Sequence, residues 1–297
     1  MFLPEARPSQ LCDGFIIPPN NLELPVTDHC NLTCQDCNHS SPAQAPWFAD
    51  PDQVYHDLSR LAKVYRPRRV KILGGEPLLH KGLLEVVRAA RAANLCQRFF
   101  LTTNGMLCDR MTPELWQQLE EIEISRYPGC LSEAIVERAR HAANQHGVIF
   151  TLVEYNEFKA TLSARTNQDE PLVERIYQTC KVAHRWGCHM VRQGYLYKCP
   201  RSAYLPVLMG YDRHLDALKI EDEPAFQARL LEFLNSPKPL RACANCLGTV
   251  GRSFPHRLLP RAEWRKSLEQ AVTDLLDPAF KERLWPAAQV GAPGSEN

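Results

Sequence analysis

The stretch Leu24–Pro42, LPVTDHCNLTCQDCNHSSP, decides the fold assignment because it places three thiols directly after a strand-like segment. Cys30, Cys34 and Cys37 follow the spacing Cys-x3-Cys-x2-Cys. Thiolates bind soft metals, so clustered thiols in a reducing compartment indicate zinc, an iron–sulfur cluster or a redox pair. The spacing of the three thiols must therefore be compared with the requirements of each kind of site.

Two metal sites remain open on the spacing alone. A structural zinc ion needs four ligands, and only His29 or His39 is near enough in the sequence to complete the set. Three thiolates on an iron–sulfur cubane instead leave one iron without a protein ligand, so that a small molecule can bind there.

The composition is that of an ordinary globular protein. Of 297 residues, 44% are hydrophobic and 23% charged, which is enough for one large domain or one and a half. The formal net charge of +1 provides no broad field for nucleic acid or an anionic membrane. The first residues lack the pattern of a secretory signal, and no run of about 18 apolar residues occurs. We therefore expect a cytoplasmic protein that binds neither nucleic acid nor membrane.

Strand-like and helix-like segments alternate through the first half of the chain. Apolar periodicity predicts helices in four segments, 50–65, 81–94, 112–121 and 131–147. Strands are predicted around them at 22–27, 68–75, 97–105, 122–128 and 148–155. This alternation is typical of βαβ units, so the fold class is α/β with a parallel sheet or barrel.

After residue 156 the alternation of strand-like and helix-like segments ends. CHMVRQGYLYKC (188–199) predicts a hairpin that turns at Gln193 and Gly194, and further helices are expected at 223–236 and 261–276. The predicted organisation is an extension (1–20), a core (21–156), a connector (157–179), a second cysteine module (180–250) and a C-terminal helix with a frayed tail (251–297).

With ILGGEPLL at the end of the second strand, the cysteine motif resembles the radical S-adenosylmethionine (radical SAM) superfamily. This resemblance implies a partial (β/α)6 barrel with a [4Fe-4S] cluster on Cys30, Cys34 and Cys37, whose open iron binds SAM. It also implies a SAM pocket. The amino group of SAM would bind at GGEP, and its ribose and carboxylate would bind at the ends of the strands predicted at 97–105 and 122–128. The pocket residues would be Gly74, Gly75, Glu76, Thr103, Asn104, Ser125 and Arg126. Asp36 departs from the family, many members of which have an aromatic residue there.

The later cysteines resemble those of the twitch module, a shortened SPASM domain with one auxiliary [4Fe-4S] cluster. Cys180 is separated by thirteen residues from Gly194, which begins Gly-x4-Cys199, and a Cys-x2-Cys pair follows at Cys243 and Cys246. A zinc knuckle is the alternative.

The second cysteine group has five thiols for the four ligand positions of one cluster, so one thiol is spare. Spacing favours Cys180, Cys199, Cys243 and Cys246 as ligands, but Cys188 faces Cys199 across the predicted hairpin. The assignment adopted is Cys180, Cys188, Cys199 and Cys243 as ligands, with Cys246 as a free catalytic thiol.

The length, the single auxiliary cluster and the surplus thiol resemble the neomycin-type aminoglycoside epimerases of antibiotic biosynthesis. The resemblance implies an isomerase that abstracts hydrogen from a sugar carbon and returns hydrogen from Cys246 on the opposite face. A flavodoxin- or ferredoxin-type protein would supply electrons. The alternatives are a dehydrogenase of a sugar or aminocyclitol, a peptide maturase, and a metal-binding scaffold without catalysis. Acidic residues at 220–224 and Glu154 are candidates for binding a cationic substrate.

Overall fold

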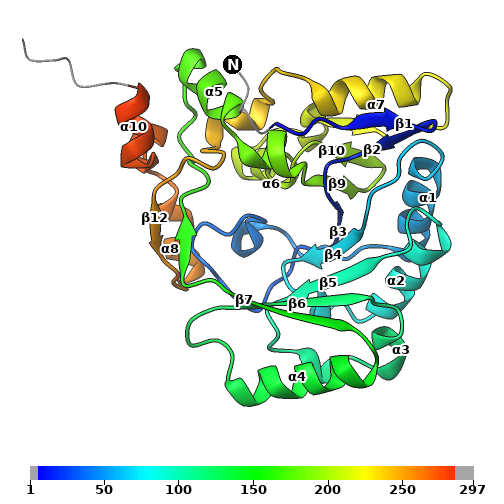
Figure 1. Ribbon diagram of the computed structural model, residues 1–297. Coiled ribbons are helices and arrows are strands. Elements are labelled where there is room, and N and C mark those ends of the chain that lie inside the picture. Colours follow the sequence, from blue (N-terminus) through cyan, green and yellow to red (C-terminus); the bar gives the residue numbers. More distant parts are fainter. Residues whose placement is uncertain (1–5, 285–297) are drawn as a thin grey trace, which may run out of the picture.

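The computed structural model describes residues 6–284, and its central element is one mostly parallel sheet (Figure 1). In spatial order its strands are β11 (Ala217–Lys219), β10 (Tyr195–Tyr197), β9 (His189–Arg192), β3 (Leu22–Thr27), β4 (Val70–Gly74), β5 (Phe99–Thr103), β6 (Glu121–Arg126) and β7 (Ile149–Glu154). The run from β9 to β7 is parallel, whereas β10 and β11 are antiparallel. The predicted α/β class with a parallel sheet is confirmed.

Four helices connect successive parallel strands and cover one face of the sheet (Figure 1). They are α1 (Pro51–Leu61), α2 (Leu83–Ala92), α3 (Pro113–Trp116) and α4 (Glu133–Gln145). Apolar side chains in adjacent strands line up on this face and are almost completely buried; one such row is Leu24, Ile72, Leu101 and Ile122. The main core therefore lies between the sheet and these helices.

The predicted helix at 112–121 is too long, since α3 ends at Trp116. The carbonyl of Gln118 accepts a hydrogen bond from Arg91, and the backbone N–H of Glu120 bonds Phe99 of β5. Because these two backbone groups bond residues of other elements, they do not make the hydrogen bonds that would extend the helix.

The predicted helix at 261–276 is also wrong in extent, because the segment divides into α8 (Arg261–Ser267) and α9 (Val272–Leu275). Between them, the carbonyl of Leu268 accepts from the N–H of Ala164, and that of Gln270 accepts from the hydroxyl of Ser163 at 2.6 Å. Bonds to another segment replace the helical ones there. The next helix, α10 (Pro278–Leu284), was not predicted, and the predicted tail at 285–297 lies outside the described residues.

The second half of the chain packs against the first beside β3 and on the cysteine loop that follows β3. The predicted hairpin exists, but β9 continues the main sheet beside β3, so the hairpin is not structurally separate from the core. The segment predicted as a connector contains α5 (Glu170–Gln178) and β8 (Glu157–Lys159), which pairs with β12 (Ser253–Pro255). The remaining helices of this half are the π-helical η4 (Val182–Trp186), α6 (Pro200–Met209) and α7 (Phe226–Asn235). The predicted 223–236 helix is thus confirmed.

The shorter elements complete the described chain. The N-terminal extension forms a hairpin of β1 (Gln10–Cys12) and β2 (Phe15–Ile17). Single 3-10 turns are η1 (Ser41–Ala43), η2 (Pro77–Leu79), η3 (Cys108–Arg110), η5 (Arg213–Asp216) and η6 (Arg241–Asn245). Two of them, η1 and η6, lie next to the two groups of cysteines.

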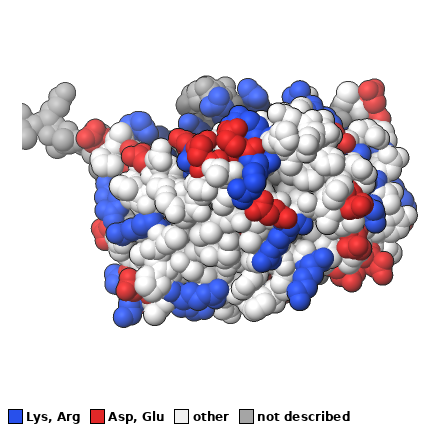
Figure 2. All heavy atoms as spheres, turned by 90° about the horizontal axis from the view of Figure 1, so that it is seen from below, with Lys and Arg blue, Asp and Glu red and all other residues white. Residues whose placement is uncertain are grey.

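The surface shows no dominant charge on the face drawn in Figure 2, where acidic and basic side chains are interspersed around an area with few charges. This agrees with the net charge of +1. None of the helices in residues 6–284 has the length and apolar character needed to cross a bilayer.

Candidate functional site

The first three thiols lie on the loop that leaves the carboxyl end of β3. Strands β4, β5 and β6 run parallel to β3, so their carboxyl ends meet the same edge of the sheet. Ligands of parallel α/β folds bind at this edge. Cys34 is buried, while Cys30 and Cys37 are partly exposed. The loop therefore presents thiols where the fold makes room for a ligand.

Distant segments hold this loop in place. The indole Nε1 of the wholly buried Trp264 donates to the carbonyl of Cys34 at 2.8 Å. The backbone N–H of Thr161 donates to the carboxylate of Asp36 at 3.1 Å. Asp36 has a φ of 52°, a conformation that Asp adopts more readily than most residues. The departure from the family pattern at Asp36 therefore has a structural use, since this side chain anchors the loop.

The glycines of the GGEP segment allow the backbones of two strand ends to approach each other closely. A Cβ on Gly74 would lie 2.3 Å from the carbonyl oxygen of Thr27, and a Cβ on Gly75 would lie 2.3 Å from that of His29. The N–H of Gly75 donates to the Thr27 carbonyl at 2.8 Å. In this structure the close approach is to the cysteine loop itself, which positions Cys30.

Replacing Gly75 with Ala is expected to lower the free energy of unfolding by about 1–3 kcal/mol, because the new methyl group would overlap backbone that cannot move aside easily. Urea unfolding of the metal-free protein measures this. Gly82→Ala is the matched control: its Cβ would meet only side-chain atoms at 3.5 Å, so a change within about 0.5 kcal/mol is expected. Equal losses in both variants would contradict the role given to Gly75.

Glu76 is completely buried and accepts three hydrogen bonds. The donors are the N–H of Leu78 at 3.0 Å, the hydroxyl of Thr103 at 2.7 Å and the N–H of Asn104 at 2.8 Å. Burial raises its pKa, and these three donors oppose the rise. The carboxylate therefore joins the end of β4 to the end of β5.

The other predicted pocket residues end β5 and β6. The side-chain amide of Asn104 donates to Asn31 of the cysteine loop at 2.7 Å, which brings the β5 end to the first thiols. Ser125 is buried, and Arg126 forms ion pairs with Glu133 at 2.8 Å and Glu154 at 3.5 Å. All seven predicted pocket residues therefore lie at the carboxyl ends of neighbouring strands, around the loop.

The surroundings of Cys37 fit a sulfur that accepts hydrogen bonds. Burial raises the pKa of its thiol, while the nearby backbone N–H groups of Ser41, His39 and Ser40 lower this pKa. The hydroxyl of Ser40 is fully buried and has no hydrogen-bond partner in the described part of the chain. Burial, with the charge of Cys37 also contributing, raises the pKa of Cys30 to about 12. A bound cluster would neutralise the cost of holding these thiolates.

No group of three or more His, Cys, Asp or Glu side chains in residues 6–284 is arranged to hold a single metal ion. The thiols of a four-iron cluster bind different iron atoms and lie farther apart than the ligands of one ion. The donor set of three cysteines on one loop fits an iron–sulfur cluster by its chemistry.

The second group of thiols comes together from four segments. Electrostatic coupling links Cys180, Cys199, Cys243 and Cys246 to one another, in addition to the burial that raises the pKa values of the first three. Gly248 packs against Cys180, since its Cβ position lies 3.3 Å from the Cys180 sulfur. The structure therefore brings these four predicted residues into one neighbourhood.

Cys188 and Cys246 differ in their surroundings. The sulfur of Cys246 accepts from the N–H of Gly248 at 3.3 Å and from the guanidinium of Arg201 at 3.6 Å. Cys188 precedes β9, and burial raises its pKa. The charges of Glu23, Cys199 and Cys180 raise this pKa further, while Lys71 lowers it. Cys188 therefore lies between the sheet and the other thiols, whereas the sulfur of Cys246 accepts two hydrogen bonds.

Polar side chains that the sequence analysis missed occupy the face of the sheet opposite α1–α4. Glu23 pairs in register with Lys71, and Lys71 lies 3.5 Å from Glu123, which also accepts from Thr102 at 3.4 Å. The signal was present in the alternation of charged and apolar residues within LELPVT, VKILGG and EIEIS. This face is a polar floor beside the two thiol groups.

Glu23 predicts a pH-dependent stability. Burial raises its pKa to about 7, although Lys71 lowers it. The folded state thus binds the proton more tightly than the unfolded state, so this contribution is complete below about pH 4.5 and is lost as the pH rises through 7. Between pH 5 and pH 8 the wild type is expected to lose on the order of 1–3 kcal/mol relative to Glu23→Gln. Urea unfolding at both pH values measures this, and exposed Glu269→Gln should show no such difference.

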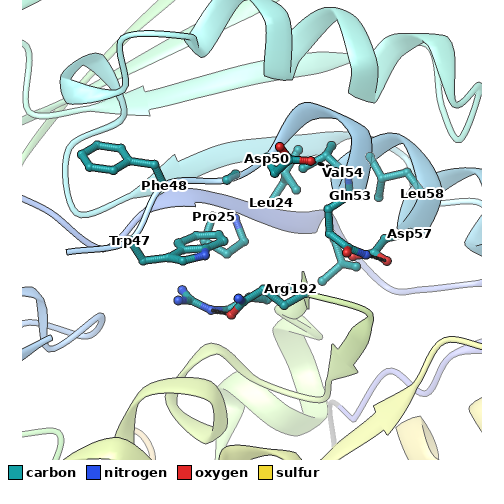
Figure 3. Close-up of a pocket in the computed structure, with 13 residues that line it drawn as sticks. Leu24, Pro25, Trp47, Phe48, Asp50, Gln53, Val54, Asp57, Leu58 and Arg192 are labelled. Carbon is teal, nitrogen blue, oxygen red and sulfur yellow. Dashed lines mark hydrogen bonds between the residues drawn. The ribbon is translucent and has the colours of Figure 1, made fainter. Parts of the chain in front are cut away.

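A cavity of about 440 Å³ lies between the start of α1 and the β9–β10 turn (Figure 3). Arg192 covers the ring of Trp47 at 3.7 Å and forms a bidentate pair with Asp28 at 2.6 and 2.8 Å. The carboxylate of Asp57 already accepts from Gly194 and Gln53, both at 2.7 Å. Asp28 lies two residues before Cys30, so these contacts fix the entry to the cysteine loop.

The acidic candidates at 220–224 and Glu154 have partners on the surface. Glu221 and Glu223 both pair with Arg229, and Asp222 pairs with Lys63 at 2.6 Å. The Glu154 side chain is 57% exposed beside Arg126. The acids at 220–224 thus form a solvated, salt-bridged turn.

Comparisons with known proteins agree with this geometry. A model of the radical SAM superfamily matches residues 24–129. The GTP 3′,8-cyclase of Peptoclostridium acidaminophilum is 32% identical over 116 residues, which cover 36% of this chain and 34% of that protein. The GTP 3′,8-cyclase of Geobacter sulfurreducens is 34% identical over 110 residues, or 36% and 33% of the two chains. The match spans about a third of the length of these relatives, which are GTP 3′,8-cyclases and not sugar epimerases.

Two solved structures are similar at lower identity. BtrN in complex with AdoMet and 2-DOIA has 16% identity and a TM-score of 0.43, covering 78% of this chain and 94% of that one. Streptococcus suis SuiB bound to S-adenosylmethionine has 12% identity and a TM-score of 0.35, covering 75% and 67%. The segment that matches the radical SAM model, residues 24–129, contains the cysteine loop and the ends of β4, β5 and β6, so the similarity to this superfamily covers the first thiol group and these strand ends. Members of that superfamily use SAM and a [4Fe-4S] cluster.

Proposed function

We propose that this chain is a radical SAM enzyme that epimerises a carbon of a hydroxylated, amine-bearing substrate of the sugar or aminoglycoside class. The proposal includes a partial barrel, a twitch-like second half and an auxiliary [4Fe-4S] cluster. The observation that carries it is the presence of five neighbouring thiols in the second group, one of which, Cys188, also lies near Glu23 of the polar floor. A spare thiol beside a substrate site is what inversion of a stereocentre requires.

We also propose that Cys188 and Cys246 exchange the roles given to them by the sequence. Cys246 receives two N–H···S hydrogen bonds, which favour a thiolate ligand over a hydrogen donor. Cys188 lies near Glu23 and Lys71 of the polar floor, where we propose that the substrate binds. The proposed ligands are therefore Cys180, Cys199, Cys243 and Cys246, and Cys188 is the proposed hydrogen donor.

When bound, the first cluster and SAM supply a 5′-deoxyadenosyl radical that removes one hydrogen atom from the substrate carbon. Cys188 then donates the hydrogen of its Sγ to the opposite face of that carbon, which leaves a sulfur-centred radical on Cys188. One electron and one proton restore the thiol. The electron comes from an external flavodoxin- or ferredoxin-type protein, and the substrate undergoes no net oxidation.

The proposed roles of the strand ends follow from their positions. Asn104 bonds Asn31 of the cysteine loop, and Ser125 and Arg126 end the neighbouring strand β6, where the ribose and carboxylate of SAM would bind. Gly74, Gly75, Glu76 and Thr103 shape the amino-group side. Because Glu76 is already bonded to three donors, its carboxylate acts mainly by holding this edge together.

The charge of the polar floor supports the substrate class. Lys71 lies beside Glu23, which is only partly ionised near pH 7, and 3.5 Å from the carboxylate of Glu123, so the centre of this face carries little net positive charge. Carboxylates attract ammonium groups and bond hydroxyl groups, and they repel a triphosphate. Cyclisation of a purine nucleotide is the second candidate, because the matching relatives are GTP 3′,8-cyclases. Oxidation of an alcohol through the auxiliary cluster is the third.

Anaerobically reconstituted protein incubated with SAM and dithionite tests this proposal. We expect 5′-deoxyadenosine above background, stimulated by aminoglycosides and not by GTP. In D2O, one deuterium should enter a product that is otherwise unchanged in mass. A product about two mass units lighter indicates dehydrogenation, stimulation by GTP alone indicates the cyclase, and no 5′-deoxyadenosine contradicts radical SAM activity.

A further inference from the structure

Arg201 lies between the two groups of thiols. It follows Cys199 by two residues in the first turn of α6, and it is only 8% exposed. Its guanidinium donates to the sulfur of Cys246 at 3.6 Å and to the carbonyl of Gly248. It also donates to Oδ1 of Asn38 from Nη2 at 3.0 Å and from Nε at 3.3 Å. Asn38 directly follows Cys37, so one side chain connects both cysteine loops.

Arg201 has no carboxylate partner within 4.0 Å among the described residues. The other strongly buried guanidinium, that of Arg192, has a bidentate carboxylate in Asp28. A buried arginine stays charged. Burying such a charge without a partner costs on the order of several kcal/mol of folding free energy. The Asp36 carboxylate on the cysteine loop is close enough for Arg201 to lower its pKa, but it forms no ion pair with Arg201 in the described structure.

Among the described residues, the acceptors of the Arg201 guanidinium at hydrogen-bond distance are the sulfur of Cys246, the carbonyl of Gly248 and Oδ1 of Asn38. Cys246 is in direct contact, and Cys180 and Cys199 belong to the same thiol group. A cluster held by four thiolates carries net negative charge, which is the counter-charge that this site lacks without metal. The apolar cluster of Leu162, Ala242, Cys246 and Trp264 also includes Cys37 at its edge, so the two loops share one packed, low-dielectric region.

We propose that Arg201 tunes the auxiliary cluster and ties it to the SAM-binding loop. Its positive charge, held against Cys246, stabilises the reduced form of the cluster and so raises its reduction potential. Its bonds to Asn38 keep that charge fixed between the two loops. Arg201 is a positioning residue, since it contacts a ligand and not the substrate. This inference rests on the proposed auxiliary cluster.

A redox titration of the reconstituted full chain, followed by electron paramagnetic resonance with and without SAM, tests the inference. The signal that does not respond to SAM is assigned to the auxiliary cluster. In Arg201→Met the one-electron reduction equilibrium is expected to shift at least tenfold toward the oxidised form, a midpoint about 59 mV lower. Arg201→Lys keeps the charge and should shift it less. Arg138→Met, which removes an exposed arginine paired with Asp109, is the matched control and should not shift it.

The outcomes are distinct. Arg201→Met protein with the wild-type content of iron and sulfide and an unchanged midpoint overturns the inference alone. Wild-type protein that binds iron and sulfide for only one cluster overturns the proposed auxiliary cluster, and the inference with it. If Arg201→Met loses its auxiliary iron, the decision rests on Arg201→Lys, where a midpoint below the wild-type value supports the inference and an equal midpoint overturns it.

Discussion

Alanine in place of Cys34 is expected to reduce SAM cleavage to background and to remove the iron and sulfide bound at the first loop. Cys34 is the buried member of the three thiols, and its carbonyl is fixed by Trp264 at 2.8 Å. With two thiolates left, a cubane would lack a second protein ligand, and the geometry that leaves a single open iron for SAM is lost. The effect on activity should therefore be complete.

Iron and sulfide analysis after anaerobic reconstitution, together with a 5′-deoxyadenosine assay, measures this result. Cys12→Ala is the control, because Cys12 is an exposed thiol on β1 and should retain full iron content and activity. Thermal unfolding of both metal-free variants separates loss of the ligand from loss of the fold. A folded Cys34→Ala protein that still cleaves SAM would show that the loop does not hold the catalytic cluster.

The sequence was sufficient for the parallel core because its periodicity and its motif depend on local spacing. Strands such as VKILGG alternate with helices whose apolar residues recur at helical intervals, and these determine which strand ends share an edge. The loop between β3 and α1 was therefore placed correctly, together with Gly75, Thr103 and Ser125 around it. Each of these positions depends on neighbours that are close along the chain.

The parts that were predicted less well depend on long-range hydrogen bonds. Nothing local in 261–276 shows that Ser163 will bond the carbonyl of Gln270 and interrupt the helix. The same holds for Trp264, whose bond to Cys34 spans 230 residues of sequence. Arg201 was missed because the sequence does not show that its guanidinium bonds Cys246 and Asn38 and forms no ion pair with a carboxylate among the described residues.

Glu76 illustrates the difference between what the motif predicts and what the structure shows. The family resemblance predicts a contact with the amino group of SAM, and the sequence places Glu76 at the correct strand end. Only the structure shows that Thr103, Asn104 and Leu78 already donate to this carboxylate. The motif therefore identifies the location of the site more securely than it identifies what each side chain does there.

Cys188→Ala and Cys246→Ala are expected to fail in different ways. Cys246→Ala should lose the iron and sulfide of one cluster, because Cys246 lies with Cys180, Cys199 and Cys243 and accepts hydrogen bonds from Gly248 and Arg201. Cys188→Ala should keep both clusters and still cleave SAM. With an accepted substrate it should form no epimer, since no thiol remains to return hydrogen to the opposite face.

Iron and sulfide content distinguishes these variants without knowledge of the substrate, and deuterium incorporation distinguishes them once a substrate is found. Cys96→Ala is the matched control, because Cys96 is a partly buried thiol that bonds only the nearby carbonyl of Arg98 at 3.2 Å. If Cys188→Ala loses the auxiliary iron while Cys246→Ala keeps it and stops epimerisation, then Cys188 is the ligand and Cys246 the donor. In that case the hydrogen bonds to the Cys246 sulfur hold a free thiol in position toward the substrate, and the charge of Arg201 acts on that thiol.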